Sequence, residues 1–143
     1  MSAAHILVID DDERLRDLLQ RFLSESGFLV TAAGSAEEAR AFLVGTMFDL
    51  LVIDVMMPEE TGTEFLADLR KRSSVPALFL TAINETEDRI AGLETGADDY
   101  VAKPFEPREL ILRIKRILAR QKLTERPNLV NFGMFSYDTD RQI

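Results

Sequence analysis

Residues 48–54 read FDLLVID, an apolar run that ends in a carboxylate. Leu, Val and Ile fill most of its positions, a composition typical of a strand in a parallel sheet that helices cover on both faces. Because a buried strand cannot hold an unpaired charge in its interior, Asp54 is expected to emerge at the carboxyl end, the edge where open α/β sheets bind ligands. The next residues, VMMPEETG at 55–62, contain Pro and Gly and predict a loop.

The composition indicates a single globular domain. The chain has 143 residues, of which 46% are hydrophobic, enough for one sizeable core. No apolar run could span a bilayer and no signal-peptide pattern opens the chain. With no cysteine for disulfides or thiolate metal sites, these features are compatible with a cytoplasmic protein that has no membrane partner. The net charge of −8 argues against direct nucleic-acid binding, and a single histidine, His5, excludes a multi-histidine metal site.

Apolar runs and helical patterns alternate along the chain on both sides of this strand. Besides 48–54, strands are expected at 5–9, 28–33, 76–81 and 99–102. Amphipathic helices are expected after each strand, with the third at about 63–71, the fourth opening at 84–87 and the fifth at Pro107. Five strand–helix alternations predict a doubly wound parallel sheet with helices on both faces.

Capping signals mark several helix ends. Asp12 is expected to cap the first helix, and Gly27 to follow its last turn. Ser35 and Glu38 stand three residues apart in capping-box form at the start of the second helix.

The last 22 residues differ from the domain at 1–121. Residues 122–128 are polar, contain Pro127 and show no periodicity, which predicts a linker. Residues 129–143 again alternate apolar and polar side chains, but 15 residues cannot bury a core alone. We therefore interpret them as the start of a second, truncated domain.

Polar residues stand at the carboxyl ends of four expected strands. Since these ends share one edge of a parallel sheet, the following side chains can face one crevice: Asp10, Asp11, Asp54, Thr81 and Lys103. Carboxylate oxygens suit Mg²⁺, and a carboxylate can accept a phosphoryl group as a nucleophile. A hydroxyl and an ammonium group would stabilise charge on the transferring oxygens.

Each of these residues also has a purely structural interpretation. An aspartate at a strand end is more often a turn or cap residue, and residues 10–12 could only complement a helix dipole. Thr81 could cap, and Lys103 could be a solvated charge. The coincidence of all of them at matching strand ends favours a site.

The same residues resemble the receiver domains of two-component response regulators. The matching segments are ILVIDDD at 6–12, LLVIDVMMPEETG at 50–62, FLTA at 79–82 and GADDYVAKPFEPREL at 96–110, within about residues 4–121. The resemblance implies a flavodoxin/CheY-like five-stranded sheet of order 2-1-3-4-5. It implies a signalling switch and not a turnover enzyme: a sensor histidine kinase donates a phosphoryl group, which is slowly lost again.

The resemblance also implies roles for individual residues. Asp54 would be the phosphoacceptor, contacted through its phosphoryl group by Thr81 and Lys103. Tyr100 would turn inward with Thr81 as the switch, and the Lys103–Pro104 bond would be cis. The implied Mg²⁺ ligands are Asp10, Asp11, Asp54 and the backbone of Met56.

Residues 98–105, DDYVAKPF, further resemble the OmpR/PhoB subfamily of winged-helix transcription factors. Residues 131–143, NFGMFSYDTDRQI, resemble the opening β-segment of the DNA-binding domain of that subfamily. This implies transcription control through promoter DNA, bound by the missing C-terminal domain and not by this fragment. It also implies a phosphorylation-dependent homodimer through the fourth helix, fifth strand and fifth helix. The candidate face comprises Arg89, Ile90, Leu93, Glu94, Asp98, Asp99, Glu109, Arg113, Lys115 and Arg120.

Mixed charges make this face self-complementary, as a two-fold interface requires. We expect Asp99 to pair with Arg113, and Arg89 with Glu109, across the axis. The alternative is a solvated surface, where such pairs contribute little.

Three other functions remain as alternatives. A haloacid-dehalogenase-like phosphatase would need a second aspartate two residues after the nucleophile, where Met56 stands. A nucleotide-binding module would need a Gly-rich phosphate loop, which no strand precedes. A degenerate receiver that dimerises without phosphate is disfavoured because every expected site residue is present.

Overall fold

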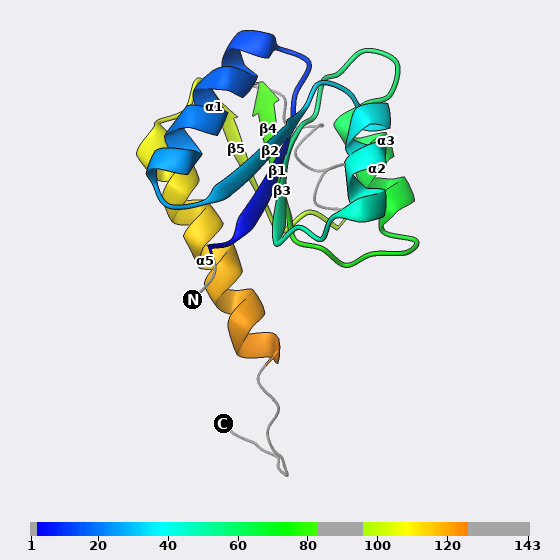
Figure 1. Cartoon of the computed structure of the whole chain (residues 1–143). Coiled ribbons are helices and arrows are strands. Elements are labelled where there is room, and N and C mark those ends of the chain that lie inside the picture. The colour runs from blue at the N-terminus through cyan, green and yellow to red at the C-terminus, as the bar shows by residue number, and fades with distance from the viewer. Residues whose placement is uncertain (1–2, 83–95, 126–143) are drawn as a thin grey trace.

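A five-stranded parallel sheet organises the chain (Figure 1). The computed structural model describes residues 3–82 and 96–125, so the predicted fourth helix lies outside the described residues. The strands follow the order β2-β1-β3-β4-β5, as predicted, and every neighbouring pair is parallel. The elements are β1 (His5–Ile9), α1 (Glu13–Glu25), β2 (Leu29–Ala33), α2 (Ala36–Gly45), β3 (Leu50–Asp54), α3 (Gly62–Leu69), β4 (Ala77–Ala82), β5 (Asp99–Lys103) and α5 (Pro107–Glu125).

Two hydrophobic clusters cover the two faces of the sheet. Helices α2 and α3 lie on one side and α1 and α5 on the other (Figure 1). Because successive strand side chains point to opposite faces, Leu51 and Ile53 of β3 join the α2/α3 cluster, while Leu50 and Val52 join the α1/α5 cluster. All five residues of β3 are buried, which confirms the prediction from its continuous apolar run.

Helix caps agree with the sequence in part. The Asp12 carboxylate accepts hydrogen bonds from the backbone N–H groups of Arg14 and Leu15 and caps α1 as predicted. Ser35 caps α2, but the capping box predicted there is incomplete, because the Glu38 carboxylate accepts from Gly34 N at 2.7 Å and not from Ser35. A complete capping box is found instead at the start of α3, between Thr61 and Glu64.

Helix α5 is longer than the sequence predicted. It continues to Glu125, so the first four residues of the predicted linker at 122–128 are helical. Its core contacts come earlier, from Leu110, Ile114 and Ile117, and its last turns project beyond the sheet (Figure 1). The sequence of residues 122–125 shows no apolar periodicity, which is why a linker was predicted where the helix continues.

Gly62 fixes the start of α3 against the end of β3. A Cβ at this position would collide with the Asp54 carbonyl oxygen and lie 2.9 Å from Ile53 Cγ2. Gly62 N also donates to the Val55 carbonyl at 2.8 Å. The end of the loop at 55–61 is therefore held close to the end of β3, the strand that ends in Asp54.

Among the described helices, none combines the length and hydrophobicity that a membrane span requires.

Candidate phosphoacceptor site

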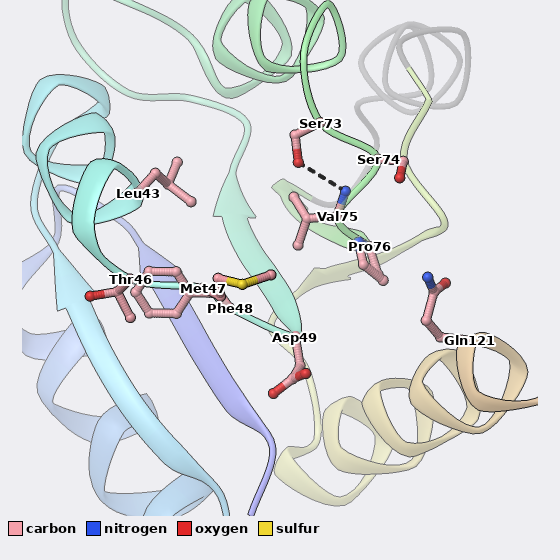
Figure 2. A pocket seen from close by; sticks show the side chains of 10 residues that line it. All are labelled: Leu43, Thr46, Met47, Phe48, Asp49, Ser73, Ser74, Val75, Pro76 and Gln121. Carbon is pink, nitrogen blue, oxygen red and sulfur yellow. Dashed lines mark hydrogen bonds between the residues drawn. The ribbon is translucent and has the colours of Figure 1, made fainter. Parts of the chain in front are cut away.

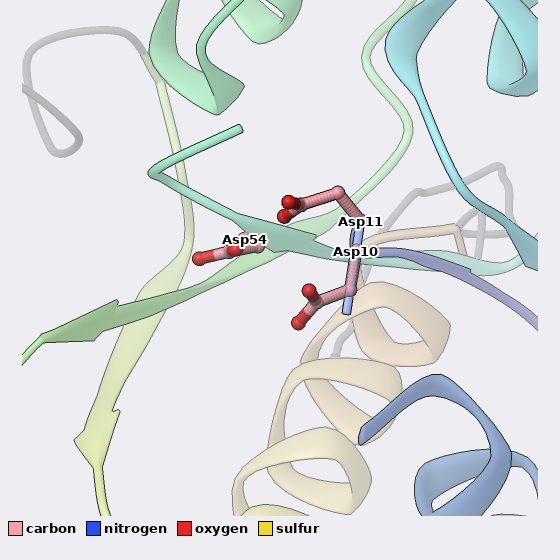
Figure 3. A group of neighbouring side chains, drawn as sticks. All are labelled: Asp10, Asp11 and Asp54. Carbon is pink, nitrogen blue, oxygen red and sulfur yellow. The ribbon is translucent and has the colours of Figure 1, made fainter. Parts of the chain in front are cut away.

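Three carboxylates meet at the carboxyl ends of β1 and β3. One oxygen from each of Asp10, Asp11 and Asp54 lies within 4.8 Å of the other two (Figure 3). Asp10 is fully buried, Asp54 is 5% exposed and Asp11 is exposed. The strand order places β1 beside β3, so residues 44 positions apart share one edge of the sheet.

Lys103 brings a positive charge to this group from the end of β5. Its Nζ lies 3.3 Å from Asp54 Oδ1 and 3.7 Å from Asp10 Oδ2. One ammonium offsets only part of the repulsion among three carboxylates. The Lys103–Pro104 peptide bond is cis.

Asp10 has one satisfied and one unsatisfied carboxylate oxygen. Oδ1 accepts from Asp12 N at 2.9 Å, whereas the buried Oδ2 has no hydrogen-bond partner among the described residues. The 3.7 Å separation from Lys103 Nζ is a charge contact without a hydrogen bond. A buried carboxylate oxygen in this state is costly, and a bound cation would satisfy it.

The environment of Asp54 raises its pKa to about 6 from the ordinary 3.8. Burial is the main cause and the charge of Asp10 adds to it, while Lys103 and the Met56 N–H oppose the increase. Burial also raises the pKa of Asp10. Asp54 is thus mostly ionised at neutral pH, yet in a surrounding that favours a proton or a cation beside it.

Thr81 and Tyr100 lie on the same face of two neighbouring strands. Thr81, at the end of β4, is buried, and Tyr100 on β5 packs half-buried against the α2/α3 cluster. Tyr100 pairs in register with Phe79, two residues before Thr81, so the alternation of side chains directs both toward the same side.

The response regulator receiver domain model matches residues 6–115. The chain belongs to the receiver domain family. PetR of Rhodobacter capsulatus is 53% identical over 142 residues, which cover 98% of this chain and 60% of PetR. The transcriptional regulatory protein AruR of Pseudomonas aeruginosa is 40% identical over 96% of this chain and 61% of AruR. The chain thus spans about three fifths of the length of these relatives.

Solved structures agree with this assignment. The receiver domain of the Francisella response regulator 1452 superposes with a TM-score of 0.78 at 36% identity, covering 82% of this chain and 98% of that domain. The sheet order and its helical layers are those of the receiver fold.

In the described part of the predicted dimer face, Asp99 and Arg113 also pair within one chain. Arg113 Nη1 binds Asp99 Oδ2 of the same receiver domain at 2.8 Å, and the pair expected across a two-fold axis stays a prediction. Arg113 also binds Glu109, one helical turn away, at 3.0 Å. Because β5 and α5 are neighbours in one chain, these opposite charges can pair without a second chain.

The other residues of that face have varied surroundings. Asp98 is turned toward β4, where its carboxylate accepts from Ala77 N at 2.9 Å, while Lys115 and Arg120 are exposed. Four of the predicted residues lie outside the described residues: Arg89, Ile90, Leu93 and Glu94.

A separate hollow of about 370 Å³ opens at the opposite edge of the sheet, before β3 and β4 (Figure 2). Its single carboxylate, Asp49, already accepts from His5 N at 2.7 Å. The other side chains that line it are apolar or uncharged, so it brings together no second charged group. Its lining consists of Leu43, Thr46, Met47, Phe48, Asp49, Ser73, Ser74, Val75, Pro76 and Gln121.

Two arginines that contact the segments following β1 and β3 were not predicted from the sequence. Arg16 Nη1 donates to the Asp10 carbonyl oxygen at 3.0 Å. Arg40 binds Glu60 in the loop that follows Asp54. Both pairs join separate elements, so no local pattern could have revealed them.

Proposed function

We propose that this receiver domain is the phosphorylation-controlled switch of a transcriptional regulator of the OmpR/PhoB subfamily, with Asp54 as the phosphoacceptor. The position of Asp54 supports this proposal most strongly. Its nearly buried carboxylate lies at the sheet edge, grouped with Asp10 and Asp11 and 3.3 Å from Lys103. By its family, the phosphodonor is a sensor histidine kinase.

The residues present fit Mg²⁺. Three carboxylates converge, and the buried Asp10 Oδ2 has no hydrogen-bond partner among the described residues, which suits a hard cation that prefers oxygen ligands. Asp10, Asp11, Asp54 and the Met56 carbonyl would hold it. When bound, it would neutralise charge on the phosphoryl oxygens.

The phosphotransfer step follows from the surroundings of Asp54. Its Oδ1 accepts from Met56 N and Lys103 Nζ, and we assign the attack on the phosphorus of the donor to Oδ2. The new O–P bond forms as the N–P bond to the donor imidazole breaks, and the imidazole keeps the electron pair. Lys103 and the Thr81 hydroxyl stabilise charge on the transferred group. Water later hydrolyses the acyl phosphate and restores Asp54, so the domain is a switch and not a turnover enzyme.

Incubation of the chain with MgCl₂ and phosphoramidate is expected to add one phosphoryl group. Intact-mass spectrometry measures it. Asp54→Asn and an excess of EDTA should each prevent the addition. Equal labelling of wild type and Asp54→Asn would refute Asp54 as the acceptor.

Transcription control is supported by relatives named as transcriptional regulators. The net charge of −8 disfavours binding of this chain to the phosphate backbone of DNA. We therefore assign promoter binding to a C-terminal winged-helix domain of the complete regulator.

Phosphorylation is proposed to favour a two-fold dimer through the face that includes β5 and α5, by way of Thr81 and Tyr100. The Asp99–Arg113 pair would exchange partners between chains. Asp99→Arg and Arg113→Asp should each weaken the phosphorylated dimer, as measured by analytical ultracentrifugation.

Mixing these two variants distinguishes the exchanged pair from the pair within one chain. In the mixed dimer both pairs across the axis are again opposite in charge, whereas each chain keeps like charges internally. Recovery of dimers in the mixture supports exchange. Recovery only in the Asp99→Arg/Arg113→Asp double variant would show that the pair acts within one chain.

A further inference from the structure

The loop at 55–61 joins Asp54 to α3 and is under backbone strain. Its ends are fixed by hydrogen bonds from Val55 N to Leu80 O at 3.0 Å and from Gly62 N to Val55 O at 2.8 Å. Between them, Glu59 has a φ of 72°, a left-handed conformation that is unfavourable for residues other than glycine. Such a conformation persists only where surrounding contacts enforce it.

Arg40 of α2 supplies a contact of that kind. Its Nη1 and Nη2 each lie 2.7 Å from one oxygen of the Glu60 carboxylate, and Nη2 also binds Asp68 of α3 at 2.9 Å. Its guanidinium carbon lies 5.1 Å from the centroid of the buried Phe65 ring. Arg40 therefore connects the residue after the strained position to two helices.

The geometry makes this pair stronger than an ordinary surface ion pair. A two-pronged contact between guanidinium and carboxylate is directional and charge-assisted, and the side chains are only 34% and 31% exposed. The hydrogen bonds from Arg40 lower the pKa of Glu60, so the carboxylate stays charged at neutral pH. Lysine could not reproduce this planar contact.

The same loop carries the backbone of Met56 beside the carboxylates. Met56 N donates to Asp54 Oδ1 at 3.3 Å, and its side chain is turned to solvent. The orientation of the Met56 peptide thus depends on the conformation of a short loop whose midpoint is strained and whose next residue is held by Arg40.

We propose that Arg40 and Glu60 are positioning residues: their ion pair holds the loop at 55–61 so that the Met56 backbone faces the three carboxylates and helps them to bind a divalent cation. This inference rests on the proposed cation site and adds two residues that touch neither the cation nor the phosphoryl group.

The charges of the two residues allow a sharp test. If they acted only through long-range electrostatics, Arg40→Met would strengthen Mg²⁺ binding and Glu60→Gln would weaken it. If they hold the loop, both substitutions weaken binding, because either one breaks the same contact. Arg40→Met also keeps an aliphatic side chain over Phe65.

Arg72→Met is the matched control. Arg72 binds the same Asp68 oxygen at 2.9 Å, but its hydrogen bonds to the described residues go to Asp68 and not to the loop. Its loss changes the net charge as Arg40→Met does. The dissociation constant for MgCl₂ is measured for each chain by NMR titration of backbone amides, and the stability without Mg²⁺ by urea unfolding.

We expect the Mg²⁺ dissociation constant to rise about tenfold in both Arg40→Met and Glu60→Gln, the lower end of what the loss of outer contacts costs a metal site, and to remain nearly unchanged in Arg72→Met. Opposite shifts in the first two variants, or an unchanged constant in both, would overturn the inference. If wild type itself binds no Mg²⁺, the proposed cation site fails instead.

Discussion

In the absence of a divalent cation, Asp54 is expected to make the domain less stable as pH rises from about 4 to about 6. Its pKa is about 6 in the fold and 3.8 in its ordinary state, so in this window the folded protein binds its proton more tightly than the unfolded chain does. The stabilisation that the Asp54 proton gives to the fold is therefore fully present below the lower pKa, and it is lost as pH rises through the higher pKa. At 1.36 kcal/mol per pKa unit, a loss of about 2–3 kcal/mol follows.

The measurement is urea unfolding in EDTA at pH 4, 6 and 8, for wild type and Asp54→Asn. The difference between the two isolates Asp54 from carboxylates whose pKa is lowered in the fold, such as Glu60 and Asp68, which act in the opposite direction. Asp54→Asn should gain stability relative to wild type as pH rises. A difference that does not change with pH would contradict the burial and repulsion described for this site.

Mg²⁺ should remove the deficit at pH 8. A ligand that binds only the folded state stabilises by mass action, on the order of 1–3 kcal/mol well above its dissociation constant. Asp11→Asn should stabilise the Mg²⁺-free protein, because it removes one of three like charges, and should abolish the gain from Mg²⁺. Identical unfolding curves with and without millimolar MgCl₂ would count against the site.

The second large effect is expected from Lys103. Its charge and its hydrogen bond both lower the pKa of Asp54, so Lys103→Met should raise that pKa above about 6 and leave less carboxylate ionised at pH 7. The fold should remain intact, since the Lys103 side chain is 32% exposed at the end of β5. An NMR titration of the Asp54 carboxyl carbon measures the pKa directly.

Phosphorylation of Lys103→Met by phosphoramidate should slow by at least about tenfold at pH 7, because fewer nucleophiles are ionised and charge on the phosphoryl oxygens is less well stabilised. Lys71→Met, which removes an exposed lysine after α3, should change neither value. A normal Asp54 pKa together with a normal rate in Lys103→Met would show that the contact at 3.3 Å has no role.

The sequence predicted the features that depend on hydrophobic periodicity and on which residues stand at the strand ends. The apolar run before Asp54 identified the central strand, and the shared edge of a parallel sheet predicted that Asp10 and Lys103 would approach it. The two were then found at 3.7 Å from each other. Such predictions succeed because topology alone brings the carboxyl ends of the strands together.

Features that depend on side-chain reach were not predictable. The Glu38 carboxylate accepts from Gly34 N and not from the expected Ser35 N, and α5 continues to Glu125 through residues whose sequence shows no apolar periodicity. Arg113 had two acidic residues within reach, and its contact with Asp99 within one chain depends on how β5 lies against α5. The Arg40–Glu60 contact joins residues 20 apart in sequence, which no local pattern encodes.

The most direct test of Asp54 as phosphoacceptor is chemical mapping of the modified residue. The chain is treated with MgCl₂ and phosphoramidate and then with borohydride, which reduces an aspartyl phosphate to homoserine. Peptide mass spectrometry then locates the homoserine. The account predicts it at position 54, with Asp10 and Asp11 unchanged. Homoserine at position 10 or 11 with Asp54 intact, or no homoserine in chains that carry a phosphoryl group, would contradict it.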